Sequence, residues 1–228
     1  MTHGYAPDIR TQEHAMTQKD VVNALLDRAG SGYAAEAGIK LADKPAPLFQ
    51  LLMLAELLST RISADIAVAA GKELMSSGYR TPKRVADADW QELVDALGRA
   101  HYKRYDESTA SRLGAVASRV LDRYGGDLRK LADEAEHDPS RAAELLQQFK
   151  GIGPTGSDIF LREVQDVWTW ARPHFDERAL RGAERVRLPK DPDRLAELAP
   201  ENHTADLAAA LVRVSLDREI ADEVLAAS

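Results

Sequence analysis

The residues with the most evident chemical use lie between Phe149 and Asp176. This segment begins Phe-Lys-Gly-Ile-Gly-Pro-Thr-Gly, with one helical pattern running into Gly151 and another starting near Pro154. Two short helices joined by a glycine turn form a helix-hairpin-helix, in which the turn and the start of the second helix present unpaired backbone N–H groups. Such groups bind anions, and on DNA the anion is a phosphate. The residues expected to form this phosphate seat are Gly151, Ile152, Gly153, Thr155 and Gly156.

An acidic residue closes the same segment. Asp176 stands immediately before a new helical pattern that contains Leu180 and Ala183. An aspartate that caps a helix is held in place and kept ionised by backbone N–H donors, which suits a catalytic carboxylate and equally suits a purely structural cap. Trp168 and Trp170 precede it and could stack on a nucleobase, although aromatic side chains more often fill a core.

The composition limits the chemistry that is possible. The chain has 228 residues, of which 44% are hydrophobic and 29% are charged, as in ordinary globular proteins. It contains no cysteine, which excludes disulfides, cysteine nucleophiles and cysteine-bound zinc or iron–sulfur clusters. His101 and His174 have no metal-ligating neighbours in the sequence, so we expect no metal and no cofactor. The net charge of -7 counts mildly against a nucleic-acid partner, but binding depends on the local charge of the contact face.

The apolar spacing predicts an all-α protein of roughly ten short helices, with no strand pattern. Its most apolar stretch, Leu48 to Leu58, should be a buried central helix. Residues 1–16 are polar and unpatterned, which predicts a disordered terminus. We expect two lobes, one formed by residues 63–149 and the other by residues 17–62 together with 150–228. No apolar run reaches membrane-spanning length and no signal peptide is evident, so we expect a cytoplasmic protein associated with the nucleoid.

The order of these parts resembles the helix-hairpin-helix glycosylases of the endonuclease III superfamily, without their iron–sulfur loop. The resemblance covers about Leu48 to Leu188, and four segments carry it. Leu58–Arg61 resembles the family's Leu-Ser-Ala-Gln element, and Tyr124–Asp127 resembles its helix end before a glycine turn. Phe149–Gly153 resembles its Leu-Pro-Gly-Val-Gly hairpin, and Phe175–Arg178 resembles its Val-Asp-Thr-His segment.

The resemblance implies roles for particular residues. Asp176 falls at the family's catalytic aspartate, which would stabilise a sugar oxocarbenium ion or activate water after the base is extruded. Arg61 falls at a glutamine that fills the space left by the flipped base. Arg178 and Arg181 follow the acid on the side expected to meet DNA. Trp168, Trp170 and Tyr102 could line the base pocket because their rings can stack on a flipped base, with a core position or a solvated loop as the competing interpretation.

This sequence also departs from the family pattern. Thr155 replaces the lysine of the bifunctional members, and without that amine no Schiff base forms at this position. We therefore expect weak or no strand-cutting lyase activity. The stretch from Thr155 to Asp176 is longer than in the family, and the extra residues fall in Trp168–Arg172. The closing region from Lys190 must be held by packing in place of a cluster.

These observations predict a monomeric, monofunctional DNA glycosylase that hydrolyses the N-glycosidic bond of a damaged base in double-stranded DNA. The alternative is a catalytically inactive helix-hairpin-helix DNA-binding protein, and a helical protein-interaction scaffold is a third possibility. One structural feature separates the first two. An enzyme should place the Asp176 carboxylate at the floor of a base-sized pocket near the hairpin, whereas an inactive binder should have that pocket filled or the acid paired elsewhere.

Overall fold

The computed structural model describes residues 17–227, and the predicted disorder of residues 1–16 concerns a segment outside that range. Every regular element in the described part of the chain is a helix, which confirms the all-α prediction. The first seven α-helices are α1 (Gln18–Ala29), α2 (Tyr33–Glu36), α3 (Pro45–Ser59), α4 (Ala64–Ser76), α5 (Pro82–Ala86), α6 (Trp90–Arg99) and α7 (Asp106–Tyr124). The others are α8 (Arg129–Glu134), α9 (Pro139–Leu146), α10 (Pro154–Val164), the 3-10 helix η1 (Thr169–Ala171), α11 (Glu177–Arg185), α12 (Pro192–Leu198), α13 (Thr204–Leu216) and α14 (Arg218–Ala227).

Local capping signals set most of these boundaries. The Ser63 side chain accepts a hydrogen bond from the Ile66 N–H and so caps α4. Gly125 ends α7 with a left-handed φ of 61°, a conformation that glycine adopts at little cost. The Asp89 side chain accepts from the Gln91 N–H and caps α6, which begins at Trp90.

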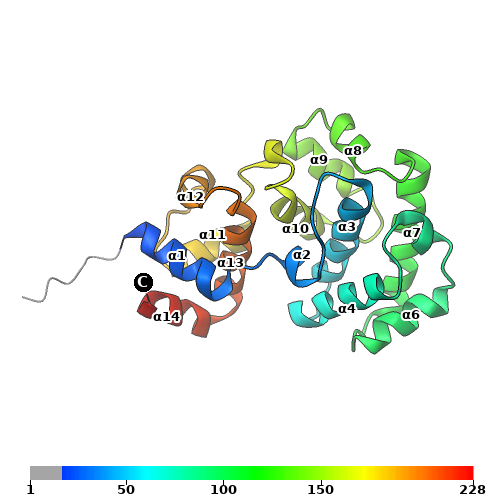
Figure 1. Cartoon of the computed structure of the whole chain (residues 1–228), viewed down its shortest axis with the longest axis horizontal. Coiled ribbons are helices and arrows are strands. Elements are labelled where there is room, and N and C mark those ends of the chain that lie inside the picture. The colour runs from blue at the N-terminus through cyan, green and yellow to red at the C-terminus, as the bar shows by residue number, and fades with distance from the viewer. Residues whose placement is uncertain (1–16, 228) are drawn as a thin grey trace, which may run out of the picture.

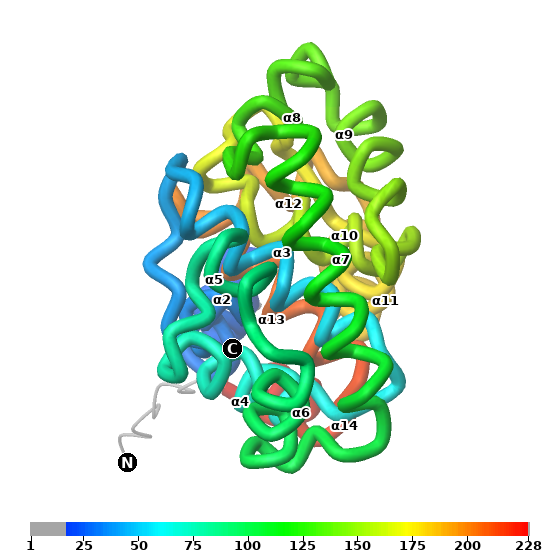
Figure 2. The backbone as a smooth tube through the Cα atoms, turned by 90° about the vertical axis from the view of Figure 1, so that its right-hand side faces the viewer, coloured from blue at the N-terminus to red at the C-terminus, as the bar shows by residue number. Residues whose placement is uncertain are grey.

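The helices gather into two groups (Figure 1). One group holds α1 and α11 to α14, in which α13 packs against both α1 and α11. The other group holds α3 to α9, with α8 and α9 at the top and α6 at the bottom in both views (Figures 1 and 2). Helix α3 packs against α4, α7 and α10, and nine of its residues are buried, which confirms the predicted central helix.

Helix α10 connects the two groups. It packs against α3 and α9 on one side and against α13 on the other. The predicted division of the chain into residues 63–149 and the remainder stays a prediction. In Figure 1, α3 and α10, which we assigned to the lobe of the termini, lie beside α4 to α9. What matters for the site is that α10 reaches from the central helix to the C-terminal group.

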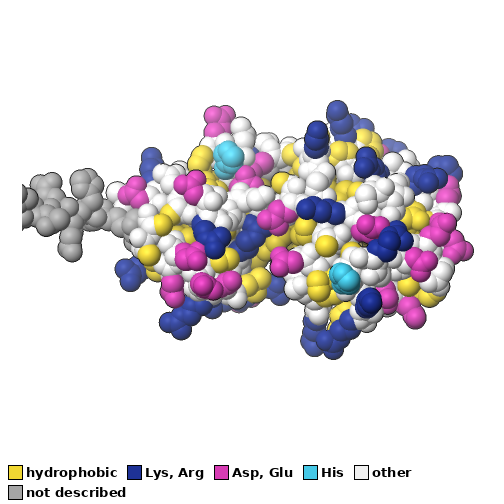
Figure 3. Space-filling view, turned by 60° about the horizontal axis from the view of Figure 1, so that its bottom comes forward, with side chains coloured by type: hydrophobic (Ala, Val, Ile, Leu, Met, Phe, Trp, Pro, Cys, Tyr) yellow, Lys and Arg dark blue, Asp and Glu magenta, His cyan; other side chains and the backbone are white. Residues whose placement is uncertain are grey.

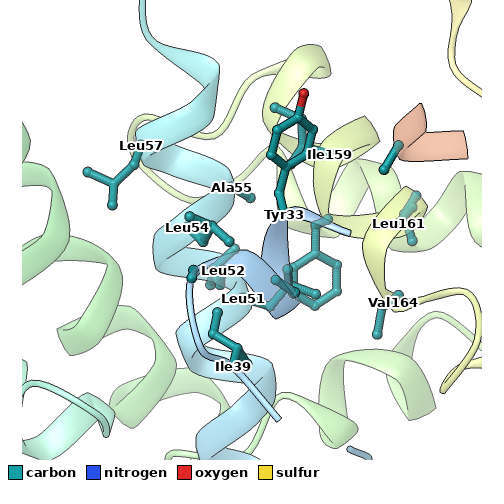
Figure 4. Close-up of a cluster of buried hydrophobic side chains, with 14 of the residues drawn as sticks. Tyr33, Ile39, Leu51, Leu52, Leu54, Ala55, Leu57, Ile159, Leu161 and Val164 are labelled. Atoms are coloured by element: carbon teal, nitrogen blue, oxygen red, sulfur yellow. The ribbon is translucent and has the colours of Figure 1, made fainter. Parts of the chain in front are cut away.

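The core around α3 includes Tyr33, whose ring lies beside α10 (Figure 4). Figure 4 shows the Tyr33 ring beside Ile159 of α10, with its hydroxyl pointing away from Leu51 and Leu52. The side chain is 4% exposed, and burial raises the pKa of its hydroxyl.

Among residues 17–227, no helix is long and apolar enough to cross a membrane.

Candidate nucleic-acid interface and acid site

The hairpin has the geometry that its glycines predict. It joins α9 to α10, and Gly151 in the turn has a φ of +97°. A Cβ at this position would lie 2.6 Å from Cδ of Arg112 and 3.1 Å from Oε1 of Glu56, so the turn tolerates no side chain. Gly153 caps α10 with extended backbone, and no heavy atom lies within 4 Å of its ideal Cβ position. The second glycine therefore leaves the end of α10 open to a ligand.

Backbone donors are available at that helix end. The Ser157 N–H donates to the Gly153 carbonyl, and the Ile152 N–H donates to Phe149. The N–H groups of Gly153, Thr155 and Gly156 have no acceptor among the described residues. Free N–H groups at the positive end of a helix form an anion seat. Ile152 has a structural role in the hairpin, because its side chain is 3% exposed and packs against Gly156.

A buried polar network supports the turn from below. Arg112 Nε donates to Glu56 Oε1 at 2.7 Å, and Arg112 Nη2 donates to the Thr109 hydroxyl at 2.8 Å. The Tyr102 and Thr60 hydroxyls lie 2.6 Å apart and extend this network to the segment before Arg61. Burial raises the pKa of Glu56 to about 7, although the charge of Arg112 opposes this shift. The hairpin thus rests on a carboxyl that titrates near neutrality.

Asp176 caps α11 as predicted. Its Oδ1 accepts a hydrogen bond from the Ala179 N–H at 2.9 Å, and its Oδ2 accepts a charge-assisted hydrogen bond from Arg162 Nη1. The side chain of Asp176 is only 8% exposed. Burial alone would raise the pKa of this carboxyl, but the Arg162 charge and the Ala179 N–H outweigh burial and hold the pKa below its usual range. Asp176 is therefore ionised at neutral pH.

Arg162 is the charged group that sequence reasoning missed. It lies on α10 with a side chain 3% exposed, between Asp176 and the buried Glu163. Its Nε is buried without a hydrogen-bond partner, because Glu163 Oε1 is 3.7 Å away, and its Nη2 donates to no described residue. The spacing in the sequence does indicate that Arg162 is buried, since it follows Ile159 by one helical turn and so shares the buried face of that helix.

A cavity of about 610 Å³ opens beside Arg162, between the start of α10 and the segment that follows α3. Its apolar wall comes from Leu58, Ile62, Ala64, Ile159, Val212 and Leu216. Its hydroxyl groups come from Tyr33, Ser59, Thr60, Ser63 and Thr155. Arg61, Arg162 and Arg178 supply its charges. None of the described residues that line the cavity carries a carboxylate. Asp176 binds Arg162 but is not itself a lining residue.

The structure brings some of the predicted residues together at this cavity. Arg61, Thr155 and Arg178 line it, and neither arginine forms an ion pair within residues 17–227. Arg181 instead pairs with Glu177 one turn earlier at 2.7 Å, on the exposed surface of α11. Arg61 and Arg178 are thus free to meet a ligand.

The three predicted base-pocket aromatics lie elsewhere. Tyr102 is fully buried in the network under the hairpin and has no ring face open to a base. Trp168 is 3% exposed, and its Nε1 donates to Asp43 at 3.0 Å. Trp170 stacks on it with ring centroids 5.0 Å apart. Both tryptophans line a smaller cavity of about 180 Å³ beside α8, so the geometry argues for a packing role.

Comparison with known proteins adds the fold. No family model matches this chain, and no curated protein matches it. A solved structure of a non-covalent endonuclease III–DNA complex is 15% identical, with a TM-score of 0.52 over 86% of this chain and 85% of that one. A trapped covalent endonuclease III–DNA intermediate is also 15% identical, with a TM-score of 0.47 over the same shares. The chain therefore has the endonuclease III fold, as the sequence resemblance predicted.

Proposed function

We propose that this protein binds double-stranded DNA as a monomer and hydrolyses the N-glycosidic bond of a damaged base. The observation that supports the proposal is the environment of Asp176 in a chain with the endonuclease III fold. It is an ionised helix-capping carboxylate whose partner, Arg162, lines a cavity next to the hairpin. A volume of about 610 Å³ is sufficient for a flipped nucleotide.

The proposed reaction uses one water and no cofactor. A DNA phosphate sits on the free N–H groups of the hairpin, and the target base enters the cavity from the bent duplex. The bond from C1′ to the base nitrogen breaks, and its electron pair leaves with the base. The Asp176 carboxylate stabilises the positive charge that develops on the sugar. Water then bonds to C1′, and the proton it loses balances the protonation of the released base.

Thr155 restricts this reaction to hydrolysis. Thr155 lines the cavity, and in the family that this sequence resembles the bifunctional members carry a lysine at the corresponding position. A hydroxyl cannot form a Schiff base with the sugar, so no lysine-mediated strand cut follows at this position.

Base release from a panel of duplexes tests the proposal. The panel carries deaminated, oxidised, alkylated and mismatched bases, and the released base is measured by chromatography with native protein and with Asp176→Asn. We expect release by the native protein and a loss of at least about 100-fold in the variant. Glu177→Gln, a neighbouring exposed carboxylate, is the matched control and should release base normally.

Two results would count against the enzyme. Equal release by native protein and Asp176→Asn would remove Asp176 from catalysis. No release from any duplex, with DNA binding retained, would leave only the binding function.

A second candidate is the catalytically inactive DNA-binding protein, and one observation favours it. The Asp176 carboxylate is paired with Arg162 and does not line the cavity, which is the arrangement expected of an inactive binder. A neighbouring guanidinium cancels part of the field that would stabilise an oxocarbenium ion. Catalysis therefore requires the sugar of the bound DNA to come within reach of the Asp176 carboxylate while that carboxylate stays bonded to Arg162. Binding without base release on the whole panel would establish this second function.

A further inference from the structure

The cavity beside the hairpin has an unusual balance of charge. Arg162 contributes a guanidinium at its inner end, and Arg61 and Arg178 contribute two more. The described lining residues include no carboxylate. A site of this kind attracts hydrogen-bond acceptors and negative charge, and it repels cations.

Arg162 is positioned to act on whatever occupies the cavity. Its side chain is 97% buried, with one nitrogen, Nη1, bound to Asp176. That bond fixes the plane of the guanidinium, because the carboxylate is itself held by the Ala179 N–H. Nη2 and Nε keep donors that no described residue accepts. Of these two nitrogens only Nε is fully buried, and a ligand acceptor in the cavity would satisfy Nη2.

We propose that Arg162 reads the extruded base, and that the cavity selects bases that present carbonyl oxygens over cationic N-alkylated bases. This rests on the proposed entry of a flipped base into the cavity. The apolar wall of Leu58, Ile62 and Ile159 accommodates a flat ring, while Nη2 of Arg162 donates to its oxygen. As the C1′–N bond breaks, the leaving base gains the electron pair, and its negative charge moves onto that oxygen. Arg162 then stabilises the leaving group while Asp176 stabilises the sugar.

A cationic base has the opposite requirement. N7-methylguanine carries a positive charge before cleavage, and it would place that charge in a cavity lined by three guanidiniums. The repulsion has no carboxylate at the cavity surface to relieve it. The two members of the ion pair thus have different roles: the Arg162 guanidinium contacts the base, whereas the Asp176 carboxylate does not reach it.

Binding to uncleavable duplexes tests this selectivity without chemistry. Duplexes carry one 2′-fluorinated nucleotide, which resists glycosidic cleavage, bearing uracil, xanthine or N7-methylguanine, and dissociation constants are measured by fluorescence anisotropy. We expect uracil and xanthine to bind about 10- to 100-fold more tightly than N7-methylguanine, the range for a hydrogen bond to a charged group. Equal or tighter binding of N7-methylguanine would overturn the proposal.

Variants assign the preference to Arg162. Arg162→Gln leaves Asp176 unpaired and can destabilise the fold, so Arg162→Gln/Asp176→Asn is measured beside Asp176→Asn. The preference should persist in Asp176→Asn and disappear in the double variant. Arg28→Gln, which removes an exposed arginine that pairs with Glu223 and does not line the cavity, should keep the preference. Persistence of the preference in the double variant would show that another group reads the base.

These binding measurements, taken together with base release from the cleavable panel, separate this inference from the proposed enzyme. A binding preference without any base release would leave the role of Arg162 standing and remove hydrolysis. Base release without a preference would do the reverse.

Discussion

At the scale of single residues, the ion pair between Arg162 and Asp176 is the central feature. Both side chains are more than nine-tenths buried, so neither charge is solvated if the other is removed. The cap bond to Ala179 adds a second requirement for a carbonyl-type oxygen at position 176. The pair therefore serves stability as well as chemistry, and its two contributions can be separated by a mutant cycle.

We expect strong coupling between these two residues. Asp176→Asn and Arg162→Gln should each lower the free energy of unfolding by about 3 to 5 kcal/mol, because each leaves an unpaired buried charge. The double variant replaces the pair by two neutral amides and should lose clearly less than the sum of the single losses. Urea denaturation of the four proteins measures this. Additive losses would mean that the two charges do not interact across this contact.

Thr155 gives a second prediction at this scale. Reduction by borohydride traps a protein amine that has formed a Schiff base with an abasic sugar. We expect no trapped covalent complex at this site with native protein. Thr155→Lys should give one, because position 155 lines the cavity and an amine is nucleophilic when its environment lowers its pKa. Trapping is read on a denaturing gel. A native adduct that survives Thr155→Ala would place the amine elsewhere.

The sequence predicted one half of the ion pair and missed the other. Asp176 was predictable as a cap because the signal is local: an aspartate directly precedes the helix and bonds to an N–H three residues on. Its partner is 14 residues away in the chain. That pairing depends on how α11 turns back on α10, which no local pattern encodes.

At the scale of elements, the two hairpin glycines have different tasks. Gly151 needs both its positive φ and the absence of a Cβ, since Arg112 is held against the turn by Glu56. Gly153 needs neither, because its φ is -99° and its Cβ would meet open space. The first glycine maintains the turn, and the second leaves room for a phosphate.

Alanine substitutions distinguish these tasks. Gly151→Ala should destabilise the protein by about 2 kcal/mol or more, from backbone strain and the clash with Arg112. Gly153→Ala should change stability by less than about 0.5 kcal/mol but weaken binding to undamaged duplex, because a methyl group would stand in front of the free N–H groups. Thermal unfolding and anisotropy measure the two effects. Unchanged DNA binding in Gly153→Ala would exclude a phosphate from this end of α10.

Elements were predictable where caps and apolar spacing coincide. The buried helix α3 and the end of α7 at a glycine turn both followed from residues within one or two turns. The aromatic residues were harder, because stacking on a base and packing in a core require the same side chains. Trp168 and Trp170 stack on each other, and only the fold reveals that their faces are already occupied.

At the scale of the whole molecule, stability should depend on pH through Glu56. Burial raises its pKa in the folded protein from 4.5 to about 7, so the folded state binds the proton more tightly than the unfolded state. The contribution is fully present below about pH 4.5 and is lost as pH rises to about 7, amounting to on the order of 3 kcal/mol. Glu56→Gln should remove this dependence. Urea denaturation of both proteins across this range measures the difference, and parallel pH profiles would contradict it.

The overall charge of the molecule predicts how DNA binding responds to salt. The net charge is -7, and the face shown in Figure 3 mixes cationic and anionic side chains without a basic patch covering it. We therefore expect binding to depend on backbone N–H groups and on cations near the hairpin that have no ion-pair partner among residues 17–227. Arg61, Lys150 and Arg178 are three of these cations.

Counterion release turns that count into a measurable slope. Three phosphate-neutralising cations give a slope of about -3 for the logarithm of the association constant against the logarithm of salt concentration. Arg61→Gln should make the slope shallower by about 1, whereas Arg28→Gln, at an exposed arginine that pairs with Glu223 and does not line the cavity, should leave the slope unchanged. Anisotropy titrations between 50 and 200 mM salt, the range over which such slopes are resolved, provide the values. A much steeper slope would require basic groups beyond the hairpin, and a slope that ignores Arg61→Gln would place the duplex on another face.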